Sequence, residues 1–165
     1  SVMLSVVKDF PDYQFVIAGA PSQEFSFYEK FITNDNIKFI SNKTYSLLQI
    51  ATAALVTSGT ATLETALFKV PEVVCYKGSW ASYQIAKRII TLKYISLVNL
   101  IMDKEVVTEL IQDNCTTDRI KQELAKILDQ QHRDQLLDQY DQLEQQLGGI
   151  GASQKTAQLI VASLK

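Results

Sequence analysis

Ser58, Gly59 and Thr60 form a short stretch between two apolar segments. The preceding run, Ala54–Thr57, is typical of a buried strand, and the Ala- and Leu-rich segment 61–68 is typical of a helix. The first N–H groups of a helix lack intrahelical partners and lie at the positive end of the helix dipole. Gly59 removes the side chain that would hold a phosphate away from these groups, and the two hydroxyls add donors. The stretch therefore predicts a phosphate-binding turn, although glycine is also common in turns that bind nothing.

Glu64 follows Thr60 by four residues, which places both side chains on one face of the predicted helix, one turn apart. A carboxylate there can accept hydrogen bonds from both hydroxyl groups of a ribose, each worth about 1.5–3 kcal/mol. The acid could instead satisfy N–H groups at the start of its own helix. A phosphate at the helix start and a ribose at Glu64 together predict a nucleotide site.

The sequence lacks the patterns of several other chemistries. It has no Asp-x-Asp pair for a metal-bound nucleotide sugar, no glycine-rich loop ending in Lys-Ser/Thr, and no Gly-x-Ser-x-Gly nucleophile. Cys75 and Cys115 are far apart in the sequence, as expected in a reducing compartment, and His132 is the single histidine. We therefore expect a metal-independent site that uses no cofactor.

Short Val- and Ile-rich segments alternate with helical patterns over the first hundred residues. We expect strands at 13–22, 37–40, 54–57, 73–76 and 94–97, and helices after Ser22 and at 44–51, 61–68 and 79–90. This alternation indicates a parallel sheet, and the absence of polar alternation along the strands indicates burial on both faces. The predicted fold class is α/β, a Rossmann-like parallel sheet of about five strands with helices on both faces and a C-terminal helical extension.

From Leu100 onward the pattern is helical. We expect a short helix at 106–111, a second helix capped by Thr117, and a third with an apolar stripe. The stripe residues of the second and third helices are Ile120, Leu124, Ile127, Leu128, Leu136, Tyr140, Leu143 and Leu147. A glycine-rich stretch then precedes a last helix whose inward residues would be Ala157, Ile160, Val161 and Leu164. We therefore divide the chain into a Rossmann-like nucleotide-sugar-binding domain, residues 1–147, and a glycine hinge with a C-terminal crossover helix, residues 148–165.

The composition is that of an ordinary globular domain: 165 residues, 47% hydrophobic and 21% charged. A net charge of −2 argues against nucleic acid as a partner. No apolar run approaches the roughly 20 residues that span a bilayer, so any membrane contact would be peripheral. The candidates for such contact are Trp80, Tyr83, Lys87 and Arg88, although the usual burial of aromatic residues favours Trp80 and Tyr83 as core contacts of their helix.

Four segments of the chain resemble the C-terminal half of lipid-A-disaccharide synthase, a glycosyltransferase with two Rossmann-like domains (GT-B). They read FVIAGAPS (15–22), SGTATLETALFKVPEVVCYK (58–77), AKRII (86–90) and YISLVNLIMDKEVVTELIQDNCT (94–116). Other GT-B enzymes share the Gly-Thr-x-Thr-Leu-Glu run in a looser form. The SLVNLIM and ELIQ segments distinguish this family from them.

The resemblance implies that the chain binds the donor, UDP-diacylglucosamine. The family transfers 2,3-diacylglucosamine from UDP to 2,3-diacylglucosamine 1-phosphate and releases UDP, a step of lipid A biosynthesis. The implied donor-binding residues are Ser58, Gly59 and Thr60 at the diphosphate, Glu64 at the ribose, Tyr76 and Lys77 near the base or donor sugar, and Asn99 beside the reaction centre. Val98 stands where many members have proline, which affects the rigidity of this loop.

The resemblance also implies a longer protein with a separate N-terminal acceptor domain, which would carry the catalytic acid or base. We therefore expect no catalytic residue in this chain and no transfer by the chain alone. A strand that should precede Ser1 is missing, so the strands at Phe15 and Ala54 would either pair directly or be joined through another chain. The hinge would allow the last helix to exchange between two copies, giving a homodimer. The lipid substrates imply a cytoplasmic location, peripheral to the inner membrane.

Two other interpretations are open at this point. The chain could be the UDP-binding domain of another GT-B enzyme, such as a UDP-N-acetylglucosamine epimerase or the peptidoglycan N-acetylglucosamine transferase, although the SLVNLIM segment argues against both. It could also be a non-enzymatic α/β interaction module. A receiver-like module would carry acidic residues at its strand ends, where this sequence has AGAPS, TSGT and YKGSW.

Overall fold

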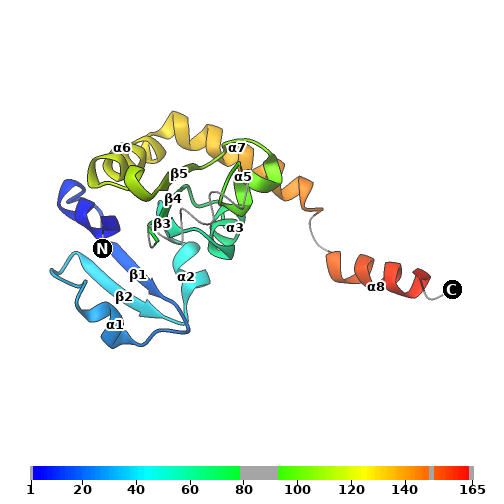
Figure 1. Cartoon of the computed structure of the whole chain (residues 1–165), viewed down its shortest axis with the longest axis horizontal. Helices are drawn as coiled ribbons and strands as arrows, with labels where there is room; N and C mark the ends of the chain where they lie inside the picture. Colours follow the sequence, from blue (N-terminus) through cyan, green and yellow to red (C-terminus); the bar gives the residue numbers. More distant parts are fainter. Residues whose placement is uncertain (1, 79–92, 149–150, 164–165) are drawn as a thin grey trace.

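The computed structural model describes residues 2–78, 93–148 and 151–163 (Figure 1). The predicted helix at 79–90, and with it Trp80, Tyr83, Lys87 and Arg88, lies outside these residues. Strands and helices alternate along the first part of the chain and helices follow, which confirms the predicted α/β class. The helical elements that lie outside the site are η1 (Val2–Asp9), α1 (Phe25–Glu29), α2 (Thr44–Leu48) and η2 (Gln112–Asn114).

The parallel strands of the described residues form two sheets. The smaller sheet pairs β1 (Phe15–Gly19) with β2 (Ile37–Ser41). The larger sheet has the order β3 (Ala54–Thr57), β4 (Glu72–Tyr76) and β5 (Thr108–Ile111). The expectation of one continuous sheet is therefore wrong, and so is direct pairing of the strands at Phe15 and Ala54. A ladder requires strands about 4.8 Å apart, and β1 and β3 pair with β2 and β4 instead of with each other.

The third strand of the larger sheet is β5, not the predicted segment 94–97. Leu110 lies opposite Cys75 in a parallel ladder, so the predicted helix at 106–111 is wrong as well. The N–H groups of Ile95 and Ser96 bond to the side chain of Glu109 instead of to a neighbouring strand. The segments 94–97 and 108–111 are both short and apolar. Their hydrogen-bond partners distinguish them: residues 108–111 pair with β4 as a strand, whereas the N–H groups of Ile95 and Ser96 bond to a side chain in a loop.

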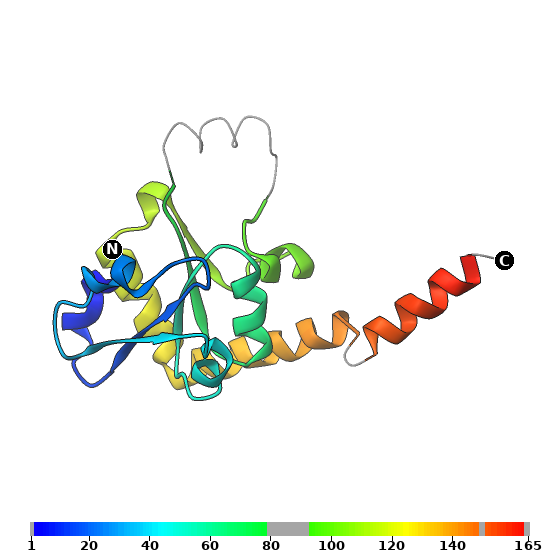
Figure 2. The ribbon, with the colours of Figure 1, turned by 90° about the horizontal axis from the view of Figure 1, so that it is seen from below.

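β4 is the centre of the core. Its residues Glu72, Val73, Val74 and Cys75 are all buried, so both faces of the strand are covered. α3 (Thr60–Leu67) and α6 (Thr117–Leu128) lie on opposite sides of this sheet (Figure 2). The double-sided burial follows from the apolar sequence of the strand, as expected for a parallel sheet.

The stripes of the helices α6 and α7 (Gln130–Gln146) are largely confirmed. Ile120, Leu124 and Ile127 of α6 are buried, as are Leu136, Tyr140 and Leu143 of α7. Leu147 follows the end of α7 and is 40% exposed, so the stripe stops one turn earlier than predicted. Thr116, not Thr117, caps α6, since its hydroxyl accepts a hydrogen bond from the Arg119 N–H.

α8 (Ala152–Ser163) extends away from the body of the molecule (Figures 1 and 2). Leu159, Ile160 and Val161 are 65%, 57% and 61% exposed, so the predicted inward packing of this helix is wrong. Gly148 and Gly151 have φ angles of 83° and 112° in the stretch that leads to it, a conformation that favours glycine. In the described part of the chain, the helix lies away from both sheets (Figures 1 and 2).

Candidate nucleotide-binding site

The turn after β3 places Ser58, Gly59 and Thr60 at the start of α3. Gly59 is the N-cap residue, with φ 152° and ψ −164°, and it has no side chain with which to cap the helix; no other described residue supplies a side-chain cap. Within residues 2–78, 93–148 and 151–163, a Cβ atom at Gly59 would meet no atom within 4 Å, so none of these residues fills the space beside the turn. Thr60 is exposed and Ser58 is half-buried. As far as the described residues go, the helix therefore begins without a side-chain cap and with space beside its first N–H groups, as a site for an anion requires.

Two side-chain hydrogen bonds between described residues hold this turn. The Thr62 hydroxyl donates to the Gly59 carbonyl at 2.8 Å, within the first turn of the helix. The Ser58 hydroxyl donates to the Ile95 carbonyl at 2.9 Å, which ties the turn to the loop before α5 (Leu97–Met102). Ser58 therefore uses its hydroxyl proton inside the protein. Its oxygen can still accept a hydrogen bond, and the Thr60 hydroxyl remains at the surface.

Glu64 lies half-buried on α3, one turn beyond Thr60. Among the described residues, its carboxylate takes part in no ion pair and in no side-chain hydrogen bond that holds the start of α3. The interpretation of Glu64 as a cap for its own helix is therefore wrong. A half-buried carboxylate that leaves the helix start uncapped retains its capacity to accept hydrogen bonds from a ligand.

Tyr76 and Lys77 lie at the end of β4, the strand next to β3. Because Thr57 pairs with Cys75, the ends of the two strands are adjacent at one edge of the sheet. Both side chains are exposed. The Tyr76 hydroxyl would lie 3.0 Å from a Cβ atom at Gly78, so glycine at that position lets the ring approach the backbone. The structure thus brings these two residues to the same edge as the turn after β3.

Asn99 is fully buried, unlike the other predicted site residues. Its Nδ2 donates to the Val107 carbonyl at 2.8 Å and to a Glu109 oxygen at 2.9 Å. Its Oδ1 accepts from the N–H groups of Val106 and Val107 at 2.7 and 2.9 Å. These four bonds use the whole hydrogen-bonding capacity of the amide. Asn99 joins α5 to the segment that enters β5, and its side chain has nothing left to offer a ligand directly.

Glu109 is a residue that the sequence interpretation missed. Its Oε2 accepts from the Ile95 N–H at 2.9 Å, and its Oε1 accepts from the Ser96 N–H and from Asn99 Nδ2, both at 2.9 Å. The signal in the sequence is an acid within the apolar stretch VVTELI, which we took for a helix. A carboxylate inside a strand next to the core requires such partners.

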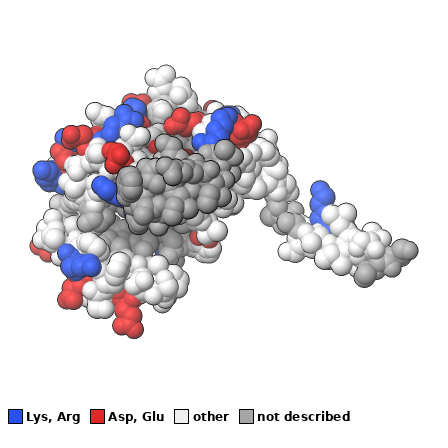
Figure 3. Space-filling view, in the orientation of Figure 1, with Lys and Arg blue, Asp and Glu red and all other residues white. Residues whose placement is uncertain are grey.

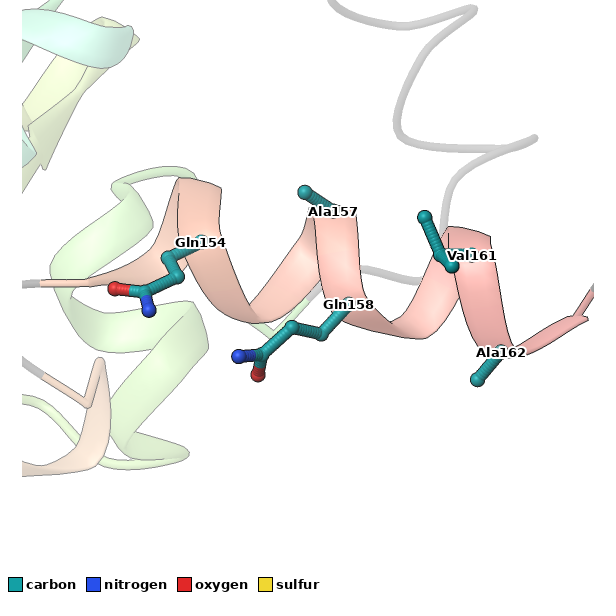
Figure 4. A pocket seen from close by; sticks show the side chains of 5 residues that line it. All are labelled: Gln154, Ala157, Gln158, Val161 and Ala162. Carbon is teal, nitrogen blue, oxygen red and sulfur yellow. The ribbon is translucent and has the colours of Figure 1, made fainter.

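The hollow along α8 is separate from this edge. Its lining side chains come from one helix and do not include a predicted site residue (Figure 4): Gln154, Ala157, Gln158, Val161 and Ala162. In the part of the chain that the structure describes, no three His, Cys, Asp or Glu side chains gather as metal ligands would. None of the helices in that part combines the length and apolar character needed to cross a membrane.

The fold and this edge define a Rossmann-like α/β protein, with an uncapped helix start and a carboxylate one turn along at the carboxyl end of its parallel strands. The chain belongs to the lipid-A-disaccharide synthetase family, whose family model matches residues 3–162. The predicted resemblance is thereby confirmed.

Curated relatives carry the name lipid-A-disaccharide synthase, a glycosyltransferase of lipid A biosynthesis. The chain is 39% identical to that of Idiomarina loihiensis over 101 residues, 40% to that of Hahella chejuensis over 100, and 42% to that of Psychromonas ingrahamii over 98. These matches cover 61%, 59% and 59% of this chain and 26%, 25% and 25% of the relatives. The matched region thus spans about a quarter of the length of the relatives.

Proposed function

We propose that this chain is the donor-binding part of a lipid-A-disaccharide synthase. It binds UDP-2,3-diacylglucosamine, whose sugar is transferred to 2,3-diacylglucosamine 1-phosphate with release of UDP. The observation that carries the proposal is the uncapped start of α3, with Gly59 at φ 152° and Glu64 one turn along, in a chain of this family. The family match favours this function over the other GT-B enzymes and over a non-enzymatic module.

The proposed roles follow from the geometry of the edge. The N–H groups at the start of α3 and the Thr60 hydroxyl bind the diphosphate, and the helix dipole stabilises the negative charge that grows on UDP as it leaves. Glu64 accepts hydrogen bonds from the ribose hydroxyls. Tyr76 and Lys77, at the end of the neighbouring strand, lie near the base or the donor sugar. These groups supply the stabilisation that a metal ion would otherwise provide, so we propose a metal-independent reaction without a cofactor.

Asn99 enters this proposal as a residue that shapes the site. Its four internal hydrogen bonds fix the approach of α5 to β5. Ser58 contributes through its backbone, because its hydroxyl proton is donated to the Ile95 carbonyl. Both residues therefore act on the donor through the conformation that they maintain.

The chemical step requires an acceptor-side domain, which we propose as the partner of this chain in the whole protein. The purified chain should bind UDP without forming the disaccharide. A thin-layer assay with both lipid substrates tests this. Disaccharide formed by the chain alone would contradict the division of roles between two domains.

We further propose that α8 mediates a homodimer. Leu159, Ile160 and Val161 are exposed, and the described part of the helix carries one charged residue, Lys155 (Figure 3). Burying these side chains against a second copy would remove apolar surface from water. Sedimentation at rising concentration should show a dimer that Ile160→Asp abolishes, whereas a strict monomer would contradict this.

Because the proposed substrates are lipids, we propose that the protein acts in the cytoplasm, at the surface of the inner membrane.

The central binding role is tested by calorimetric titration of the chain with UDP and ADP. UDP should bind more tightly than ADP. Glu64→Ala should lower the affinity for UDP at least tenfold, because the two charge-assisted hydrogen bonds from the ribose hydroxyls to Glu64 are lost. Glu105→Ala, which removes an exposed glutamate elsewhere, is the matched control. Equal affinity for the two nucleotides, or unchanged UDP affinity in Glu64→Ala, would contradict the assignment.

A further inference from the structure

Glu109 connects the interior of the sheet to the turn at the start of α3. Its carboxylate holds the Ile95 N–H, and the Ile95 carbonyl in turn receives the hydroxyl of Ser58. The two polar groups of one residue, Ile95, are thus fixed from two sides. A chain of two hydrogen bonds, each 2.9 Å long, runs from β5 to the turn that follows β3.

The direction of the Glu109 side chain follows from the register of the sheet. Glu109 lies opposite Val74 of β4, and Val74 lies opposite Val56 of β3. Its neighbour Thr108 projects to the other face, where its hydroxyl bonds to Glu123 of α6. Successive side chains of a strand alternate between faces, so Glu109 projects to the face opposite α6.

We propose that Glu109 is a positioning residue of the donor site: it fixes the Ile95 backbone, to which Ser58 is anchored, and thereby sets the conformation of the diphosphate-binding turn. The inference rests on the proposed function for its ligand, and its geometry stands on the contacts above. A carboxylate is suited to this task because it presents acceptors to three donors at once. Asn99 donates its Nδ2 to Oε1 of Glu109 and so helps to hold the carboxylate in place.

The Glu109→Gln variant breaks this connection at one point. The amide oxygen of Gln can replace Oε1 and keep the Ser96 and Asn99 bonds, which leaves the amide nitrogen facing the Ile95 N–H. Two donors then face each other at the bond that leads to Ser58. Ser58→Ala breaks the same connection from the other side and keeps the proposal testable if Glu109→Gln does not fold.

The matched control is Glu123→Gln. Glu123 is a carboxylate on the opposite face of the sheet, bonded to Thr108 of the same strand as Glu109 and to Lys126; it is buried, whereas Glu109 is half-buried. It makes no contact with Ile95 or Ser58. A general loss of stability would therefore affect both glutamine variants alike, and a positioning effect would appear in Glu109→Gln alone.

The experiment compares the affinity of the whole chain for UDP and for uridine by NMR titration. In Glu109→Gln and in Ser58→Ala, we expect UDP to bind at least fivefold more weakly and uridine to change less than twofold, because the turn contacts only the phosphates. The double variant should lower the affinity for UDP no more than twofold beyond either single variant, because the two substitutions break the same connection from Glu109 through Ile95 to Ser58. Glu123→Gln should change neither affinity by more than twofold.

Other results would overturn the inference. If Glu109→Gln keeps the UDP affinity of the wild type, or loses UDP and uridine affinity equally, Glu109 does not position the turn. If the wild-type chain binds neither ligand, the proposed function fails. Amide hydrogen exchange in the absence of nucleotide then tests separately whether Glu109 positions the turn. Positioning predicts exchange at residues 59–61 at least fivefold faster in Glu109→Gln than in Glu123→Gln, and equal rates would refute it.

Discussion

Replacing Glu72 with Gln should stabilise the chain by an amount that grows with pH. Glu72 is 0% exposed at the start of β4, and neither carboxylate oxygen has a hydrogen-bond partner in the described part of the chain. Burial raises the pKa of this carboxyl well above its ordinary value of 4.5. Tyr140 of α7 is the titratable group beside it, and burial together with the nearby Glu72 raises the pKa of the Tyr140 hydroxyl as well.

The sign follows from which state holds the proton. Above pH 4.5 the unfolded chain loses the Glu72 proton, whereas the folded chain keeps it up to the higher pKa. Stability of the wild type therefore falls over this interval as pH rises, by about 1.4 kcal/mol per pH unit. Gln has no such proton to lose. For a chain of 165 residues, its advantage in Tm should grow by roughly 3–6 °C per pH unit.

Thermal unfolding followed by circular dichroism at pH 5, 6 and 7 measures this difference. Other carboxyl groups titrate in both proteins, so the quantity to compare is the variant Tm minus the wild-type Tm at each pH. Thr65→Val, which changes a buried residue without an ionisable group, should differ from the wild type by a constant amount. A Glu72→Gln difference that stays constant or shrinks with rising pH would show that the folded chain does not hold the Glu72 proton.

Three further predictions concern single residues. Asn99→Ala should lower the free energy of unfolding by about 2–4 kcal/mol, because it leaves the buried N–H and carbonyl groups of Val107 and the half-buried N–H of Val106 without partners. Urea unfolding measures this loss, and a loss below about 1 kcal/mol would contradict the prediction. Gly59→Ala should lower the free energy of unfolding by about 1–3 kcal/mol in the same assay, because alanine is strained at a φ of 152°, and not because its Cβ atom would clash with a described residue. An unchanged free energy of unfolding would contradict this and show that the turn adapts. Burial, and to a lesser extent the neighbouring Cys115, raises the pKa of the Cys75 thiol to about 12. Iodoacetamide at pH 8 should therefore leave Cys75 unlabelled until urea unfolds the chain. Rapid labelling of Cys75 in the native protein, detected by mass spectrometry, would contradict this.

The sequence predicted the elements that depend on local pattern. The strands β3 and β4 and the helix α3 have the predicted bounds to within one residue, because a buried parallel strand and a Gly-containing turn have clear local signals. The uncapped turn at Gly59 and the position of Glu64 on α3 followed from the same pattern. These are the parts of the candidate site that lie close together in the sequence.

The errors concern partners that are distant in sequence. The segment 94–97 is as apolar as a strand, but its N–H groups bond to Glu109, and no local pattern announces such a bond. The spacing of residues in α8 predicted a buried face, whereas the helix leaves the core after Gly148 and Gly151. Asn99 was expected at the ligand because of its resemblance to a motif. Its burial depends on the position of β5, which was itself assigned wrongly.

The most direct test of the account is to map where UDP binds by NMR chemical shifts of the backbone amides of this chain. We expect the largest shifts at residues 58–61, at the start of α3, with smaller shifts at Tyr76 and Lys77 and none along α8. Glu64→Ala should require at least ten times more UDP to reach half of the same shifts. Shifts that are largest elsewhere, or a Glu64→Ala titration identical to that of the wild type, would contradict the claim that this edge binds the nucleotide.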